Sequence, residues 1–144
     1  MKPGDLLPPL DLPPVDRTML ALFAGASGDH NPIHIDIDFA RRCGMPDVFA
    51  HGMLGMAWMG RLLTQWVPQS QLREYSVRFA GITHLGNAMR CRGEVTELLD
   101  LDGEPCARVT VVAANQYGQQ KTIGEAIVAV AHGRGAPVDG PSGL

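Results

Sequence analysis

The sequence predicts an α+β domain in which an antiparallel sheet packs around one long helix. Two observations support this fold class. The segment 51–66 is apolar almost all round, which is typical of a buried helix. Beyond Pro68 the apolar residues recur with a period of two, which indicates strands. The chain has 144 residues, of which 45% are hydrophobic, so we expect a single domain over residues 1–144.

The first 35 residues predict an extended segment, a short helix and a loop. Residues 1–15 are rich in proline, which cannot donate to a sheet ladder, so we expect an extended lead-in with room for one short edge strand. Asp16 is a good N-cap for a helix that should end near Gly28. Residues 29–35 should form a loop, because Pro32 disfavours helical geometry at the preceding residue.

Two further helices are expected before the sheet. Asp36 can cap a short helix over residues 37–43, with Phe39 and Ala40 facing inward. The long helix over residues 51–66 contains three glycines, each of which costs helix stability. Close approach of a sheet is the packing reason that we expect for these glycines: Gly52, Gly55 and Gly60.

Four strands are predicted after Pro68 from the alternating pattern. Their apolar or small residues are Tyr75, Val77 and Phe79; Met89, Cys91, Gly93 and Val95; Val109, Val111 and Ala113; and Ile123, Ile127 and Ala129. The pair Asp102-Gly103 indicates a hairpin, and a second turn is expected around Gly118. Residues 133–144 are rich in glycine and proline and predict a flexible tail.

Composition excludes several classes of function. A net charge of -3 and scattered basic residues favour neither nucleic acid nor an anionic membrane as a partner. The chain starts with no signal-peptide pattern, and its apolar segment is too short for a membrane span, so we expect a cytoplasmic protein. Cys43, Cys91 and Cys106 are widely spaced and are interpreted as reduced core cysteines rather than zinc ligands or disulfides.

The residues that indicate chemistry are Asp29, Asn31 and His34, together with Gly52. A carboxylate and an imidazole in one loop suit acid–base work, and an amide can fix the orientation of either. Gly52 lies where the long helix begins, so its free N–H can stabilise a developing oxyanion. Glycine there also lets a substrate approach closely.

Each of these residues also has a purely structural interpretation. Asp29 and Asn31 are common in loops and helix caps. His30 and His34 are four residues apart and could bind a metal, but Pro32 interrupts the helix that would align them and no third ligand stands out. We therefore expect no metal site. The methionines of the long helix are interpreted as core residues.

The string Ser27-Gly28-Asp29-His30-Asn31-Pro32-Ile33-His34, followed by Ala50-His51-Gly52-Met53, resembles the MaoC-like (R)-specific enoyl thioester hydratases and (3R)-hydroxyacyl thioester dehydratases, the hydratase 2 family. The resemblance implies a hotdog fold and a dimer. It places the catalytic pair on Asp29 and His34, the donor to the thioester carbonyl on the Gly52 N–H, and a supporting role on Asn31. It implies an enzyme that hydrates trans-2-enoyl thioesters without a metal or redox cofactor.

Several points stay open at this level. The carrier of the acyl group would be coenzyme A or acyl carrier protein, whose phosphates would have to meet scattered arginines such as Arg41, Arg42 or Arg61. A hotdog thioesterase is the alternative activity, although the Asp29/His34 pair argues against it. The chain could also be one subunit of a heteromeric dehydratase. Acyl length and the physiological direction are not predicted.

Overall fold

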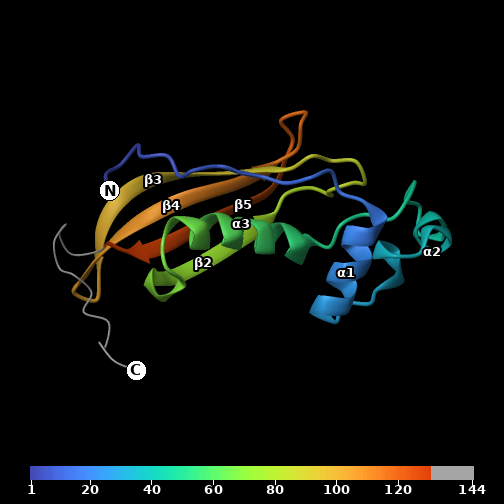
Figure 1. Ribbon diagram of the computed structural model, residues 1–144, viewed down its shortest axis with the longest axis horizontal. Helices are drawn as coiled ribbons and strands as arrows, with labels where there is room; N and C mark the ends of the chain where they lie inside the picture. Colours follow the sequence, from blue (N-terminus) through green and yellow to red (C-terminus); the bar gives the residue numbers. More distant parts are fainter. Residues whose placement is uncertain (131–144) are drawn as a thin grey trace, which may run out of the picture.

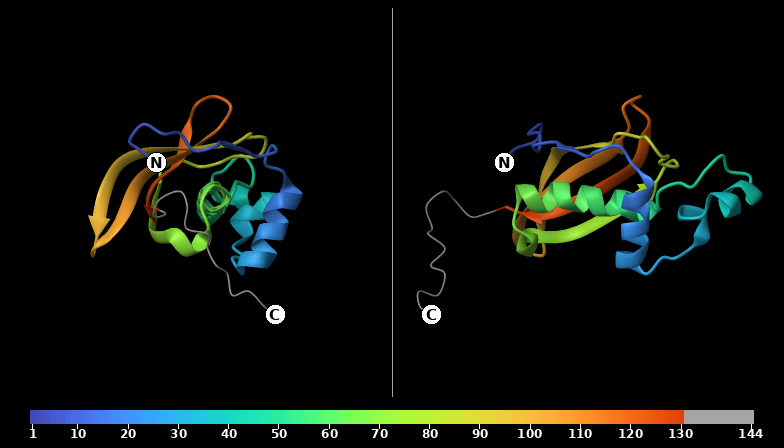
Figure 2. Two further views of the ribbon diagram at one scale, coloured as in Figure 1. Left: turned by 60° about the vertical axis from the view of Figure 1, so that its left-hand side comes forward. Right: turned by 45° about the vertical axis from the view of Figure 1, so that its right-hand side comes forward.

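The computed structural model describes residues 1–130, and the predicted tail over 133–144 lies outside the described residues. A five-stranded antiparallel sheet with the order β1-β3-β4-β5-β2 curls around one long helix, as Figures 1 and 2 show. The strands are β1 (Leu10–Asp11), β2 (Leu72–Phe79), β3 (Arg90–Leu101), β4 (Glu104–Ala114) and β5 (Gln120–Ala129). The helices are α1 (Arg17–Ser27), α2 (Ile37–Arg42) and α3 (Gly52–Trp66), with short 3-10 turns at Pro32–His34 and Gln69–Gln71. The predicted α+β class is confirmed.

The predicted helix caps of the N-terminal third are present. The Asp16 side chain accepts a hydrogen bond from the Met19 N–H at 2.8 Å, and α1 ends at Gly28, whose φ of 76° suits glycine. Asp36 caps α2 in the same way. These bonds satisfy N–H groups that a helix leaves unpaired, so local sequence alone sets where α1 and α2 begin.

The sheet follows the predicted hairpin and edge strand. Asp102 and Gly103 both have positive φ, 52° and 86°, as a two-residue turn between twisted strands requires. They join β3 to β4, which pair along their whole lengths. In the lead-in, Leu10 of β1 pairs with Cys91 and so forms one edge of the sheet. The other edge is β2, which pairs only with β5 among the described strands.

The helix α3 buries one face in the concave side of the sheet, which Figure 2 (left) shows nearly end-on. Its buried residues are Leu54, Gly55, Trp58, Met59, Leu62 and Leu63. The prediction that this helix is buried all round is wrong for the single chain. Met53 is 53% exposed and Ala57 is also exposed, because the sheet covers only the face opposite to them. The described helices include none that is both long and apolar enough to cross a bilayer.

Two glycines of α3 lie where neighbouring strands approach closely, and the third does not. A Cβ on Gly55 would lie 2.6 Å from the Thr122 hydroxyl of β5, and a Cβ on Gly52 would lie 3.2 Å from the Phe79 ring of β2. At Gly60 the nearest atom, in the Tyr75 ring, would be 3.8 Å away, which is ordinary contact. The packing explanation is therefore wrong for Gly60.

Gly55→Val is expected to lower the melting temperature by about 5 °C or more. Overpacking of a core typically costs about 1–3 kcal/mol, which exceeds the gain in helix propensity from losing a glycine. The matched control is the same change at Gly60, which should leave the melting temperature nearly unchanged. Thermal unfolding followed by circular dichroism measures both, and equal losses would contradict the assignment of the close contact to Gly55.

Three further details differ from the sequence-based expectations. In β5, Thr122 faces α3, because its hydroxyl lies against Gly55. Successive side chains of a strand point to opposite faces, so the predicted apolar residues Ile123, Ile127 and Ala129 lie on the face away from α3. Phe39 is only half-buried, whereas Ala40 is fully buried. Cys43 is exposed, because it follows α2 at the surface, while Cys91 and Cys106 are buried; all three are free.

Candidate active site

The loop after α1 is held by a succession of short-range bonds that also positions Asp29. The Asp29 N–H donates to the Ser27 hydroxyl at 3.1 Å, and the Asn31 N–H donates to Asp29 Oδ1 at 3.2 Å. The Asn31 Oδ1 in turn accepts from the Ile33 N–H at 3.1 Å. The Asn31 side-chain oxygen therefore helps to shape the loop. The Asp29 carboxylate is exposed and keeps its second oxygen for a ligand.

His34 lies in the 3-10 turn that follows, and its tautomer is set by the backbone. Its Nδ1 lies 2.8 Å from the Phe49 carbonyl oxygen, which can only accept, so Nδ1 carries the hydrogen. The other nitrogen, Nε2, is then left with a lone pair. The half-buried ring packs edge-on against the Phe49 ring. This arrangement leaves one basic nitrogen for proton transfer.

His51, the residue before α3, lies against both Asp29 and His34, although the sequence motifs predicted no role for it. It is 2% exposed, and its ring stacks on the His34 ring at a centroid distance of 3.9 Å. Its Nε2 lies 3.1 Å from the backbone oxygen of Asp29 and donates to it. A sequence signal existed, since histidine occupies an N-cap position where Ser, Thr, Asp and Asn are preferred.

Burial favours the neutral form of His51. Loss of water contact lowers the pKa of His51, the bond to the Asp29 carbonyl raises it by less, and nearby His34 lowers it further. An unfolded histidine takes up a proton near its ordinary pKa of about 6.5, whereas folded His51 does so only at lower pH. The stability that neutral His51 contributes is therefore complete above about pH 6.5 and falls as the pH drops below that value.

Asp29, His34 and His51 are the described residues whose possible metal-ligand atoms come together, all within 4.8 Å of one another. Their geometry fits hydrogen bonding better than metal binding. The two histidine rings are stacked, so their nitrogens do not converge on one point, and one nitrogen of each already meets a backbone oxygen. His30, the ligand considered in the sequence analysis, is exposed and lies outside this cluster.

The helix α3 begins beside this cluster with its N–H groups uncapped. Gly52 is its first residue, no side chain caps the helix, and no acidic residue lies in its first turn. The first N–H groups of a helix lack intrahelical acceptors and carry partial positive charge. Because His51 is bonded to the Asp29 loop, this end of α3 lies next to the carboxylate. An oxyanion held there would be stabilised.

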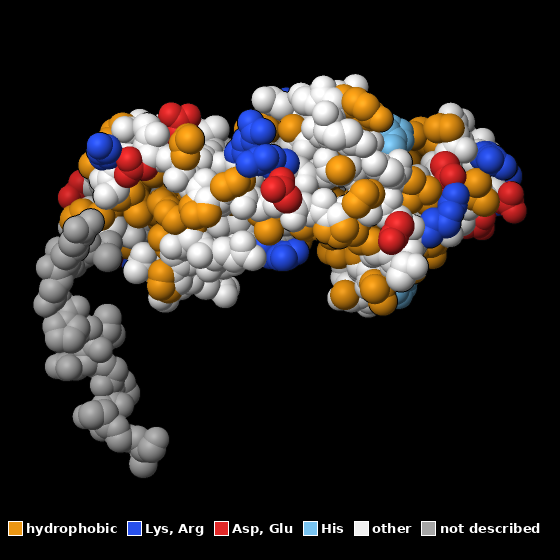
Figure 3. Space-filling view, turned by 45° about the horizontal axis from the view of Figure 1, so that its top comes forward, with side chains coloured by type: hydrophobic (Ala, Val, Ile, Leu, Met, Phe, Trp, Pro, Cys, Tyr) orange, Lys and Arg blue, Asp and Glu red, His pale blue; other side chains and the backbone are white. Residues whose placement is uncertain are grey.

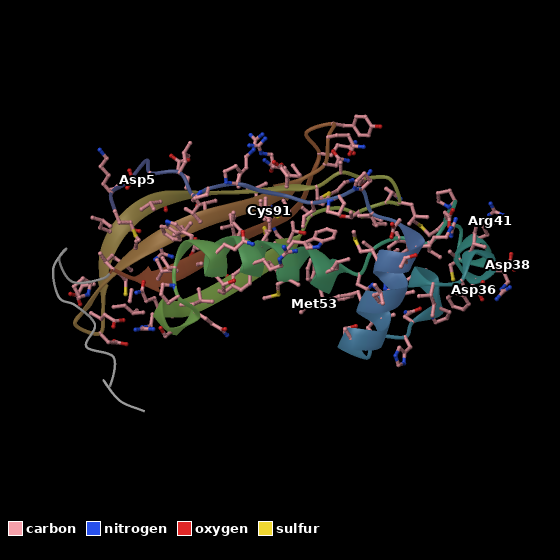
Figure 4. All side chains as sticks on the ribbon, viewed as in Figure 1. Asp5, Asp36, Asp38, Arg41, Met53 and Cys91 are labelled. Carbon is pink, nitrogen blue, oxygen red and sulfur yellow. The ribbon has the colours of Figure 1, made fainter. Side chains whose placement is uncertain are left out.

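An apolar groove of about 480 Å³ leads away from Asp29 along the exposed face of α3. It is lined by Ser27 and Asp29 at the loop, Phe23 of α1, Met53, Met56, Ala57 and Gly60 of α3, and Tyr75 of β2. Figure 4 shows Met53 between α3 and α1, on the side of α3 away from the sheet. The Tyr75 hydroxyl donates to the Met56 carbonyl oxygen at 2.6 Å, which ties β2 to the helix. The groove thus runs from the Asp29 carboxylate of the acid–base cluster along an apolar surface.

The candidate arginines and the other hollow lie elsewhere. Arg41 and Arg42 are in the last turn of α2, and Figure 4 shows Arg41 far from the sheet. Arg61 is exposed on α3. A larger hollow of about 770 Å³ lies over β3 and β4 and includes Arg90 and Arg92 but none of the acid–base cluster. On the face drawn in Figure 3, basic side chains are separated by acidic ones.

Comparison with known proteins gives consistent matches. Residues 9–116 match the family described as MaoC like domain. The chain is 32% identical over 111 residues to the (R)-specific enoyl-CoA hydratase of Aeromonas caviae, which covers 76% of this chain and 81% of that protein. R-hydratase PhaJ1 from Pseudomonas aeruginosa superposes with a TM-score of 0.77 at 27% identity, covering 96% of this chain and 92% of the other.

A third match is a heteromeric assembly. The ChsH1-ChsH2 complex of Mycobacterium tuberculosis includes a chain that superposes with a TM-score of 0.78 at 25% identity, covering 90% of this chain and 98% of that one. These matches confirm the hotdog architecture expected from the sequence motifs. They also show that this fold occurs in complexes of different subunits.

Proposed function

The chain belongs to the MaoC-like domain family and is a hydratase/dehydratase enzyme, and from this premise we propose that it reversibly hydrates trans-2-enoyl thioesters to (3R)-3-hydroxyacyl thioesters. One observation carries the proposal. The Asp29 carboxylate and the His34 imidazole belong to one cluster beside an uncapped helix N-terminus, and Asp29 also lines an apolar groove. These are the groups that addition of water to a conjugated thioester requires.

In the proposed reaction, Asp29 and His34 hold one water molecule and move its protons. The oxygen of the water adds to C3 of the enoyl group, one proton of the water leaves to the acid–base pair, and a proton is delivered to C2. Negative charge develops on the thioester oxygen as the C2–C3 double bond is lost. The Gly52 N–H is proposed to donate to that oxygen. No metal or redox step is needed.

The exposed face of α3 is proposed to bind the acyl chain. The groove starts at Asp29 and continues past Met53 and Ala57 to Gly60. From Met53 to Gly60 the groove follows about 10 Å of α3, because each of the seven steps advances the helix by about 1.5 Å. An acyl chain bound there would bury apolar surface that the single chain leaves exposed.

The carrier and the oligomer are also proposals. Coenzyme A and acyl carrier protein both present the thioester on an arm long enough to enter such a groove, and Arg61 on α3 is the basic candidate closest in sequence to its lining. The edge strand β2 and the exposed Phe79 and Met53 offer a surface for a second hotdog subunit. A homodimer and a heterodimer both fit this surface, and size-exclusion chromatography of the chain expressed alone distinguishes them.

A direct test supplies crotonyl-CoA to the purified chain. Hydration removes the enoyl absorbance without releasing free thiol, whereas a thioesterase releases thiol. We expect loss of absorbance, no thiol, and a (3R) product. Thiol release at a comparable rate would replace the proposed hydratase with the thioesterase, and a panel of longer enoyl-CoAs would then measure how much chain the groove accepts.

Gly52→Val is expected to slow hydration about 100-fold while the protein still folds. The β-branched side chain blocks approach to the Gly52 N–H, and loss of one oxyanion donor typically costs about 10²–10³ in kcat. The new side chain also crowds the Phe79 ring, since even a Cβ would lie 3.2 Å from it. The double variant Gly52→Val/Phe79→Ala relieves that crowding and serves as the control. Recovery of normal turnover in the double variant would contradict the role of the N–H.

A further inference from the structure

His51 is a buried histidine that the proposed reaction does not use. It touches both members of the acid–base pair: its ring stacks on His34 at 3.9 Å, and its Nε2 donates to the backbone oxygen of Asp29 at 3.1 Å. It is also covalently next to Gly52, the proposed carbonyl donor. One side chain therefore links three groups that come from two separate segments of the chain.

We propose that His51 is a positioning residue that holds Asp29, His34 and the start of α3 in their relative places, and that it does so with its hydrogen on Nε2. The proposal rests on the proposed hydratase function. The hydrogen bond fixes the backbone at Asp29, and the stack fixes the plane of the His34 ring. Catalytic groups must be held within fractions of an ångström of their productive geometry, which makes such support valuable.

The neutral form of His51 follows from its surroundings. Its Nδ1 is buried and has no hydrogen-bond partner among the described residues, so a proton placed there would be left unpaired. The titratable groups that act on the ring are the Asp29 carboxylate and His34, and the uncharged Phe23 ring packs edge-on against it at 4.9 Å. A proton on His51 would place two positive charges in stacked rings whenever His34 is protonated, and like charges at that separation repel each other.

The two stacked histidines, His34 and His51, therefore have different roles. Both rings donate to a backbone oxygen through one nitrogen, but only the free nitrogen of His34 belongs to a residue that is partly open to solvent. His51 therefore takes no part in proton transfer. It presents a flat, uncharged surface against which His34 can gain and lose its proton without turning.

Two substitutions separate the two contacts of His51. His51→Phe keeps a flat ring for the stack but removes the donor to Asp29, and His51→Gln keeps a donor of similar reach but removes the ring. We expect each variant to lower kcat for crotonyl-CoA about 10- to 100-fold, with KM changed less than about threefold, because groove residues are untouched. His30→Gln, in the same loop but exposed and outside the cluster, is the matched control and should stay within about twofold of wild type.

A spectroscopic readout tests the same proposal without relying on turnover. Nitrogen-15 NMR of histidine-labelled wild-type protein, titrated downward from pH 8, should show neutral His51 as the Nε2–H form and neutral His34 as the Nδ1–H form. His51 should take up its proton only at a pH below the pKa of an unfolded histidine. In His51→Phe, the pH profile of kcat/KM should shift relative to wild type, which a loss of folded protein alone would not produce.

The outcomes are decisive in either direction. The proposal is overturned if His51 carries its hydrogen on Nδ1 or if both variants keep kcat within threefold. It is also overturned if activity falls only in proportion to the folded fraction measured by circular dichroism. If the wild type fails to hydrate any enoyl thioester, the proposed function fails, and the tautomer of His51 still decides whether it holds the cluster in the proposed state.

Discussion

Asp29→Asn is expected to reduce the rate of enoyl-CoA hydration by about 10²- to 10⁴-fold, the range typical of a lost general acid–base group. Asparagine has nearly the same shape, and its side-chain oxygen can still accept the hydrogen bond that Asp29 Oδ1 receives from the Asn31 N–H. The loop should therefore keep its conformation and lose only the basic oxygen. Stopped-flow or steady-state absorbance with crotonyl-CoA measures the rate, and circular dichroism verifies the fold.

The matched control for this prediction is Asp38→Asn. Asp38, labelled in Figure 4, is an exposed acidic residue in the first turn of α2 and does not belong to the acid–base cluster. Its substitution should leave turnover within about twofold of wild type. A loss below tenfold for Asp29→Asn, with an unchanged circular dichroism spectrum, would remove Asp29 from the proposed mechanism and leave it as a loop residue.

Local signals in the sequence predict much of this fold. Asp16 and Asp36 cap helices where expected, Asp102 and Gly103 make the expected hairpin, and the period of two marks the strands. These features depend on hydrogen bonds between near neighbours, which the sequence displays directly. The exposure of Met53 could not be predicted in this way, because an apolar residue on a helix looks the same whether a sheet, a substrate or a second subunit covers it.

The sequence predicted two residues of the candidate site but not the third. The motif pointed to Asp29 and His34, and the fold brings them together. The contacts of His51 could not be predicted, because they are tertiary. Its hydrogen bond joins residues 22 positions apart, and no local pattern shows that its ring will stack on His34. Asn31 is the reverse case, since its side-chain oxygen bonds to a neighbour two residues away. The supporting role that the resemblance implies for Asn31 stays a prediction.

His34→Ala should slow hydration as much as Asp29→Asn, about 10²- to 10⁴-fold, and the double variant should lose little more than either single one. If both residues act on one water molecule, removing either disables the unit, so the losses do not multiply. The free Nε2 of His34 and the open oxygen of Asp29 belong to the same compact cluster, which is the structural reason to expect this coupling. Single-turnover rates of the wild type, the two single variants and the double variant measure this coupling as a double-mutant cycle.

The alanine variant also removes a ring that packs against His51 and Phe49, so a second variant separates chemistry from packing. His34→Asn offers a side-chain N–H close to the position of Nδ1 and can keep the bond to the Phe49 carbonyl oxygen, yet it has no basic nitrogen. We expect it to be more stable than His34→Ala and equally slow. If His34→Asn restored turnover, or if the losses from Asp29→Asn and His34→Ala multiplied cleanly, the two residues would act in independent steps rather than on a shared water molecule.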